Sequence, residues 1–353
     1  MLALLSFCKN RHVSAFGWTS GNLSVINSAR WCSSRIDDHY SEPDYSKLPR
    51  LYVGPEPALV RFPPRPGAHD TPRTPLSSLS PNALLALSPE QSHHVTTVLR
   101  MDKRNKAPQI RVFDGVGGEW LANLEQMHRL DGTGGRRRSR ASSDPVIGTC
   151  TESLRSQTST PTVWLCVAPP KKKDRTRWMI EKTTELNVGG YVWLQTDYSQ
   201  SVDLRGNKLQ AHVMEAAEQC ERLHLPFFGS PTEQDDVGCT TPLRMFLSLW
   251  KDPENEVKLL VCRERSSSQS IWNALGRTQS SRTGVTTPIA LLVGPEGGWS
   301  RDEELLLDEL EQLNPDAIFN ISLGPTVLRA ETAAITAVAA YTLFQDSLPK
   351  AQD

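Results

Sequence analysis

The chain has 353 residues, a formal net charge of -1 and 38% hydrophobic residues. This length exceeds that of one typical domain, so we expect two folded units with extensions. The near-neutral total charge does not exclude an RNA partner, because nucleic-acid binding needs only a locally basic face. We expect no membrane span, since no apolar run approaches the roughly 18 residues that a spanning helix needs.

The first 36 residues have the composition of an organelle transit peptide. They contain no Asp or Glu, and Lys9, Arg11, Arg30 and Arg35 add positive charge among seven serines. Their apolar start is too short for a secretory signal. We therefore expect import into the mitochondrial matrix, with the chloroplast stroma as the alternative and an unstructured leader as the simpler reading.

The seven cysteines are scattered along the chain, and none belongs to a C-x-x-C pair. This pattern predicts reduced thiols in an intracellular compartment and no metal site.

The range 48–161 shows short strand-like runs separated by turn residues, which is typical of a small β-barrel. The predicted strands are residues 51–53, 59–62, 83–87, 110–113 and 119–124. Two segments with loop composition, 65–81 and 131–161, are predicted to be disordered insertions. The second contains the run Arg136, Arg137, Arg138 and Arg140, which suits either a solvated tail or contact with RNA phosphates.

In the range 162–346 strands alternate with helices, which is the signature of a mostly parallel α/β sheet. The predicted strands are 163–168, 190–196, 257–262, 289–293 and 317–321, and the predicted helices are 175–187, 208–223, 301–312 and 329–344. Ser300 and Glu303 form a capping box at the start of the third helix. The Ser/Arg-rich range 265–287 is predicted to be a loop with one short helix.

Two glycine turns carry the strongest local signal for a site. In LLVGPEGGWS (residues 291–300) an apolar strand runs into a Gly-rich turn and a capped helix, and in ISLGPTVLRAETAA (residues 321–334) a strand reaches a Gly-Pro turn before Arg329 and Glu331. Ligands of open α/β sheets bind at the carboxyl ends of strands, where glycines admit them close to the backbone. The first turn lacks the Lys-Ser/Thr of a P-loop.

With these turns the sequence resembles the RsmE family of ribosomal RNA uridine-N3 methyltransferases, in the SPOUT superfamily. Other matching segments are LPRLYV (48–53), SHHVTTVLRM (92–101), VFDG (112–115), KKDR (172–175) with EKTTEL (181–186), and EQCER (218–222) with Pro226. The resemblance spans residues 48 to 345 apart from the insertions. Two positions depart from the family pattern, since Thr326 and Tyr198 stand where cations are usual.

The resemblance implies a PUA-like RNA-binding barrel followed by a SPOUT α/β domain with a trefoil knot, a homodimer, and S-adenosyl-L-methionine as cofactor. It implies methylation of N3 of one uridine in small-subunit (16S-like) ribosomal RNA or the assembling small subunit. Two alternatives are a SPOUT enzyme acting on transfer RNA and a non-catalytic ribosome-assembly factor that binds RNA.

Site residues follow from the resemblance and from the chemistry of N3 methylation, which needs a proton acceptor and a cation for the developing anion. The catalytic candidates are Arg222, Glu296, Arg329 and Glu331. The cofactor-binding candidates are Gly294, Glu296, Gly298, Ile321, Leu323, Gly324 and Leu328. The RNA-binding candidates are Arg100, Lys171, Lys172, Lys173 and Arg175, whose charges suit phosphates. For Glu331 a purely structural pairing with an arginine is the alternative.

Overall fold

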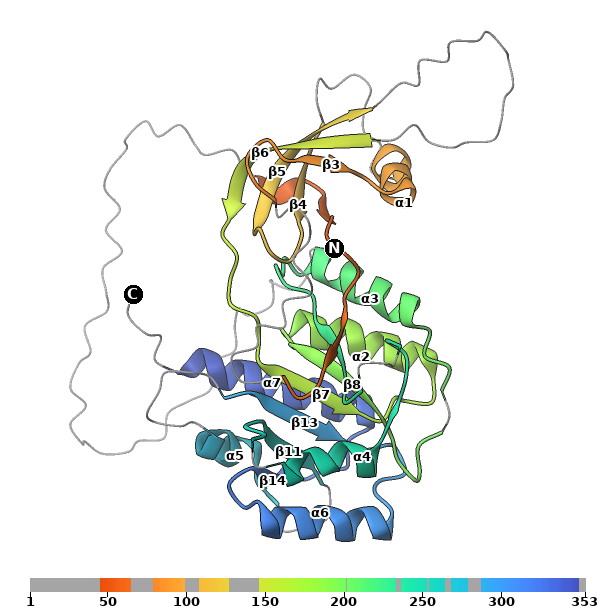
Figure 1. The fold of residues 1–353 in the computed structure, drawn as a ribbon, viewed down its shortest axis with the longest axis vertical. Coiled ribbons are helices and arrows are strands. Elements are labelled where there is room, and N and C mark those ends of the chain that lie inside the picture. The colour runs from red at the N-terminus through yellow and green to blue at the C-terminus, as the bar shows by residue number, and fades with distance from the viewer. Residues whose placement is uncertain are drawn as a thin grey trace, which may run out of the picture. The chain divides into compact units, whose positions relative to one another are not determined.

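The computed structural model describes residues 45–64, 79–98, 108–126, 146–200, 202–232, 236–252, 254–263, 268–278 and 287–348. The predicted leader 1–36, Arg100 and the predicted arginine run lie outside these ranges, so those predictions are not tested by the fold. Within the described ranges the strands form two sheets, one mostly antiparallel and one parallel (Figure 1).

The first sheet has five strands in the order β1-β4-β5-β6-β3. Its strands are β1 (Arg50–Tyr52), β3 (Leu84–Ala86), β4 (Gln109–Phe113), β5 (Glu119–Gln126) and β6 (Val146–Arg155). All pairs are antiparallel except β1 with β4. The short helix α1 (Pro89–His93) precedes a π-helical turn, His94–Val98, whose Val95 packs into the apolar core of this sheet. This half-barrel is the predicted PUA-like unit.

The second sheet has nine strands, and all its pairs are parallel. The order is β12-β14-β11-β13-β7-β8-β9-β2, with β10 beside β8. The strands are β2 (Leu59–Arg61), β7 (Val163–Val167), β8 (Gly190–Gln195), β9 (Phe227–Ser230), β10 (Thr241–Pro242), β11 (Lys258–Cys262), β12 (Gln269–Ser270), β13 (Ile289–Val293) and β14 (Ile318–Ser322).

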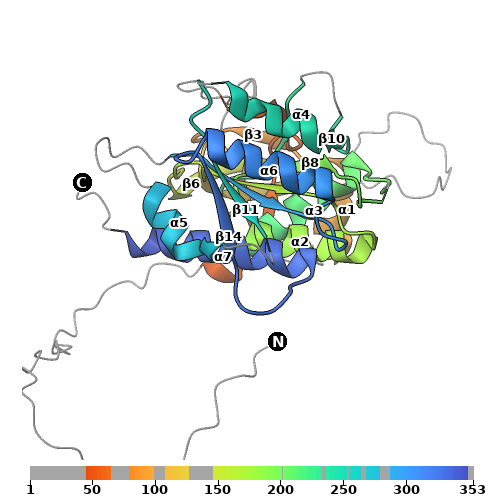
Figure 2. The same ribbon diagram turned by 90° about the horizontal axis from the view of Figure 1, so that it is seen from below.

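Helices cover both faces of the parallel sheet (Figure 2). One face packs against α2 (Lys173–Glu185), α3 (Gly206–Gln219), α5 (Ile271–Thr278) and α7 (Ala330–Ser347), and the other against α4 (Leu243–Ser248) and α6 (Arg301–Leu313). Alternation along β7 explains the two layers, because Leu165 enters the first core and Cys166 the second. Among the described helices, none is long and apolar enough to cross a bilayer.

Two sequence predictions about the β-domain are wrong. The run 59–62 was expected in the barrel, but β2 pairs with β9 in the parallel sheet. The range 131–161 was expected to be an insertion, but it contains β6, which pairs with β5 and β3. The polar composition of β6 hides it, because only alternate residues such as Val146 and Cys150 are buried. The strands β9, β10 and β12 and the helix α4 were also missed.

A buried ion-pair network joins the two sheets. The Arg50 Nε donates to Glu119 Oε1 at 2.5 Å, and its two terminal nitrogens donate to the carbonyl oxygens of Ala217 at 2.6 Å and Arg222 at 2.7 Å. The same carboxylate of Glu119 accepts from Arg155 Nε at 2.5 Å. Arg50 therefore neutralises a buried carboxylate and caps the end of α3 with one side chain.

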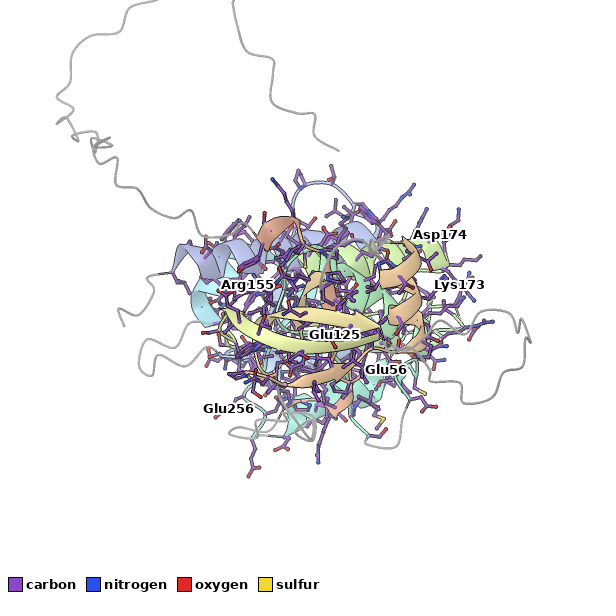
Figure 3. The ribbon with its side chains drawn as sticks, turned by 90° about the horizontal axis from the view of Figure 1, so that it is seen from above. Glu56, Glu125, Arg155, Lys173, Asp174 and Glu256 are labelled. Atoms are coloured by element: carbon purple, nitrogen blue, oxygen red, sulfur yellow. The ribbon has the colours of Figure 1, made fainter. Side chains whose placement is uncertain are left out.

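Replacing Glu119 with Gln is expected to lower the free energy of unfolding by about 3–5 kcal/mol, because buried guanidinium groups lose their counter-charge. Chemical denaturation of the purified chain measures this change. The matched control is Glu125→Gln on the same strand, whose side chain is exposed and labelled in Figure 3. Equal stability of the two variants would show that the network does not hold the sheets together.

Candidate functional site

The site lies where four neighbouring parallel strands end. Because β14, β11, β13 and β7 are consecutive in the sheet and parallel, their carboxyl ends meet at one edge. The turn after β13, the turn before α7 and the start of α2 therefore come together, although they are far apart in the sequence.

The turn after β13 is closed by its own backbone and by an indole ring. Gly298 has a φ of +73°, and its N–H donates to the Pro295 carbonyl at 2.9 Å. A Cβ at Gly294 would lie 3.0 Å from the ring of Trp299, whose Nε1 donates to the Cys262 carbonyl at 3.4 Å. Trp299 thus ties this turn to the end of β11 and leaves Gly294 no room for a side chain.

The turn after β14 is open on its outer side. Gly324 has a φ of +136°, which favours glycine, and no atom lies within 4 Å of the position that its Cβ would take. Leu323 and Leu328 flank it and are partly buried against the core. Ile321 lies within β14, fully buried, and its carbonyl accepts from the Arg263 N–H at 3.1 Å. Ile321 therefore belongs to the strand that leads into the turn and not to the turn itself.

Charged groups from three elements meet between the turns. Arg175 Nε lies 3.4 Å from Glu331 Oε1, and Arg175 Nη1 lies 3.9 Å from Glu296 Oε1. Glu331 is buried in the first turn of α7, where the helix dipole favours a carboxylate. Its second oxygen, Oε2, is buried without a hydrogen-bond partner among the described residues. Arg329, the N-cap residue of α7, is exposed.

The structure does not bring Arg222 to this group. Its Nε, Nη1 and Nη2 donate to the carbonyl oxygens of His224 at 2.6 Å, Thr184 at 3.1 Å and Val188 at 2.5 Å. Burial lowers the pKa of its guanidinium to about 10, so it stays charged at neutral pH. The guanidinium group of Arg222 thus satisfies carbonyls at the end of α2, and the catalytic role predicted for it stays a prediction.

Lys171, Lys172 and Lys173 are exposed at the start of α2. Lys173 is labelled beside Asp174 in Figure 3 and lies 3.4 Å from Asp203. Arg175 differs from these lysines in its surroundings, because its guanidinium group faces the carboxylates of Glu296 and Glu331. The pairing of Arg175 with these two carboxylates was not predicted, because the sequence gives strand and helix positions but not strand order.

Two other polar features lie away from the turns. A cavity of about 270 Å³ lies at the ends of α2 and α3, lined by residues that include Arg155, Asn187 and Arg222. On α2 and α3, the ligand atoms of Glu181, His212 and Glu215 lie within 4.8 Å of one another. Glu181 already accepts from Arg177 at 2.6 Å, so its carboxylate is paired.

The arrangement between the turns suits a ligand with both apolar and cationic parts. Space is open beside Gly298 and Gly324, where no atom beyond the neighbouring residues lies within 4 Å of either Cβ position. Leu323 and Leu328 offer apolar contact, and Glu331 Oε2 offers an unpaired buried acceptor. Burial raises the pKa of the nearby Cys262 thiol to about 12, which disfavours its thiolate form at neutral pH.

Family models match both parts of the chain. An RNA methyltransferase domain matches residues 157–342, and an RNA methyltransferase PUA domain matches residues 87–131. The chain is 30% identical over 270 residues to the ribosomal RNA small subunit methyltransferase E of Rickettsia conorii, covering 76% of this chain and 93% of the relative. The chain belongs to the ribosomal RNA small subunit methyltransferase E family. The Synechocystis member is 29% identical over 271 residues, covering 75% of each chain.

Solved structures agree with this fold. The methyltransferase E of Neisseria gonorrhoeae, bound to S-adenosylmethionine, aligns with a TM-score of 0.57 and 22% identity over 84% of this chain and 97% of that chain. A methyltransferase of Legionella pneumophila with bound S-adenosylmethionine gives a TM-score of 0.57 and 23% identity over 85% of this chain and 98% of that chain. These likenesses support the overall fold, while the predicted knot stays a prediction.

Replacing Arg222 with Met is expected to lower the free energy of unfolding by about 3 kcal/mol, because three buried carbonyls lose donors that each contribute about 1 kcal/mol or more. Thermal or urea unfolding measures the loss. Arg244→Met, at an exposed position of α4, is the control and should unfold like the wild type. If the Arg222→Met protein is as stable as the wild type but has lost methyl transfer, the result would support the predicted catalytic role of Arg222.

Proposed function

We propose that this protein uses S-adenosyl-L-methionine to methylate N3 of a uridine in small-subunit ribosomal RNA. The observation that carries the proposal is the meeting of both glycine turns with Glu296, Glu331 and Arg175 at one sheet edge. The names of the relatives also support the proposal, because they are called ribosomal RNA small subunit methyltransferase E.

The residues between the turns fit the proposed cofactor. Gly298 and Gly324 leave open space beside the turns, and Leu323 and Leu328 supply an apolar surface for the adenosyl group. The unpaired buried oxygen of Glu331 supplies negative charge for a cation. When bound, the cofactor supplies a methyl group on a positively charged sulfur.

Side chains of the protein must then accept the N3 proton and stabilise the negative charge that develops on the base. Uridine N3 carries a proton at neutral pH and lies on the base-pairing edge, so the base has to leave its stack to reach the turns. Glu296 and Glu331 are the carboxylates in position to accept the proton, directly or through water. Arg329 is exposed at the same helix start and stabilises the developing uracil anion.

The RNA surface is proposed to include the exposed lysines 171–173. They stand at the start of α2, directly after the strand β7 that ends at the site edge. Phosphate contacts of this kind position the RNA and make its binding salt-dependent, while base identity is read in the pocket. A homodimer and mitochondrial import by residues 1–36 are also proposed, on the sequence resemblance and composition alone.

Replacing Arg329 with Ala is expected to lower methyl transfer to small-subunit particles about 100-fold, the usual cost of losing one group that stabilises transition-state charge. Cofactor affinity should stay within about twofold, because the proposed contact is to the base. Transfer of a labelled methyl group and calorimetric cofactor titration give the two values.

The control is Arg61→Ala, which removes an exposed cation from β2 and should leave both values unchanged. Wild-type methyl transfer in the Arg329→Ala protein would refute the role of this arginine. Absence of cofactor binding in the unmodified protein would refute the proposed function itself.

A further inference from the structure

Arg175 connects two turns that are otherwise independent. Its Nε lies 3.4 Å from Glu331 at the start of α7, and its Nη1 lies 3.9 Å from Glu296 in the turn after β13. Arg175 itself belongs to the first turn of α2. One guanidinium group therefore links three elements that leave the same edge of the sheet.

The charge at this point is unbalanced. Two carboxylates face one guanidinium group, which leaves one negative charge in this cluster. Arg329 at the same helix start is exposed, so solvent screens its charge more than that of the buried Glu331. Glu331 cannot rely on solvent for compensation, since its side chain is 6% exposed and its Oε2 has no partner among the described residues. A buried carboxylate oxygen without a partner is costly, so the arrangement favours a cation placed between the turns.

The proposed methyl donor is a cation, whereas the product that it leaves after methyl transfer is not. S-adenosylmethionine carries one net positive charge because of its sulfonium group, and S-adenosylhomocysteine, which has lost the methyl group, is neutral overall. A site with one net negative charge distinguishes the two by charge. Such a site holds the methyl donor more tightly than the spent product.

We propose that Arg175 is a positioning residue that ties Glu296 to Glu331 and sets the negative charge that the pocket presents to the sulfonium group. This inference rests on the proposed function. It also revises the RNA-binding role predicted for Arg175. Lys173 is the contrast, since its side chain is 66% exposed and its partner Asp203 is 63% exposed.

The test compares the dissociation constants of S-adenosylmethionine and S-adenosylhomocysteine by calorimetry on the full chain. In Arg175→Met the pocket gains a net negative charge, so the preference for the methyl donor should rise about three- to tenfold over the wild type. Glu331→Gln removes a negative charge, so the preference should fall by a similar factor. Arg175→Lys keeps the charge and should restore a preference close to that of the wild type.

The matched control is Arg177→Met on the same helix, whose side chain is 53% exposed, and its preference should equal that of the wild type. An unchanged preference in Arg175→Met, or equal loss of both ligands, would overturn the proposal and leave Arg175 a purely structural residue. If Arg175→Met does not fold, Arg175→Gln replaces it with the same expected rise and the same contradicting result. Failure of the wild type to bind either ligand would instead refute the proposed function.

Discussion

The site depends on one constraint, which is that β14, β11, β13 and β7 lie side by side and run parallel. Parallel strands deliver their carboxyl ends to a single edge, so the segments that follow them converge whatever their distance in the sequence. Here the convergence brings Glu296, Glu331 and Arg175 within ion-pair distance. The glycines matter because of this convergence, since side chains at Gly298 or Gly324 would occupy space that is open beside the converging turns.

A second constraint couples the β-domain to the parallel sheet. Glu119 is buried between guanidinium groups from both ends of its own domain, and Arg50 extends this pairing to the carbonyl oxygens at the end of α3. A buried charge tolerates few alternative positions, because displacement leaves it unpaired. The network therefore fixes how the RNA-binding sheet attaches to the domain that carries the turns. The crossing of β2 into the parallel sheet adds a backbone connection to the same attachment.

The sequence predicted the parts of the fold that local pattern determines. The apolar runs of β7, β8, β11, β13 and β14 were found because both faces of these strands are buried, and the capping box at Ser300 and Glu303 is confirmed. Local pattern could not reveal pairing. β2 has the composition of a barrel strand yet joins the other sheet, and β6 lies hidden in a segment of loop-like composition.

The same limit applies to the site. Glu296 and Glu331 could be singled out because each follows a glycine turn, which is a local signal. The contacts of Arg175 and Arg222 could not be predicted, since a cation near a helix end looks alike in the sequence whether it faces phosphate, a carboxylate or a carbonyl. Only the strand order and the tertiary contacts separate these cases, as the pairing of Arg175 with two carboxylates and of Arg222 with three carbonyls demonstrates.

The central claim is that the protein methylates a uridine of small-subunit ribosomal RNA at N3, and the identity of the modified nucleoside tests it most directly. Small-subunit particles that lack the modification are incubated with the purified chain and S-adenosylmethionine, and the digested RNA is analysed by mass spectrometry. The account predicts N3-methyluridine at one position per particle and none in transfer RNA treated in the same way. Methylation of another base or another atom, or of transfer RNA alone, would contradict it.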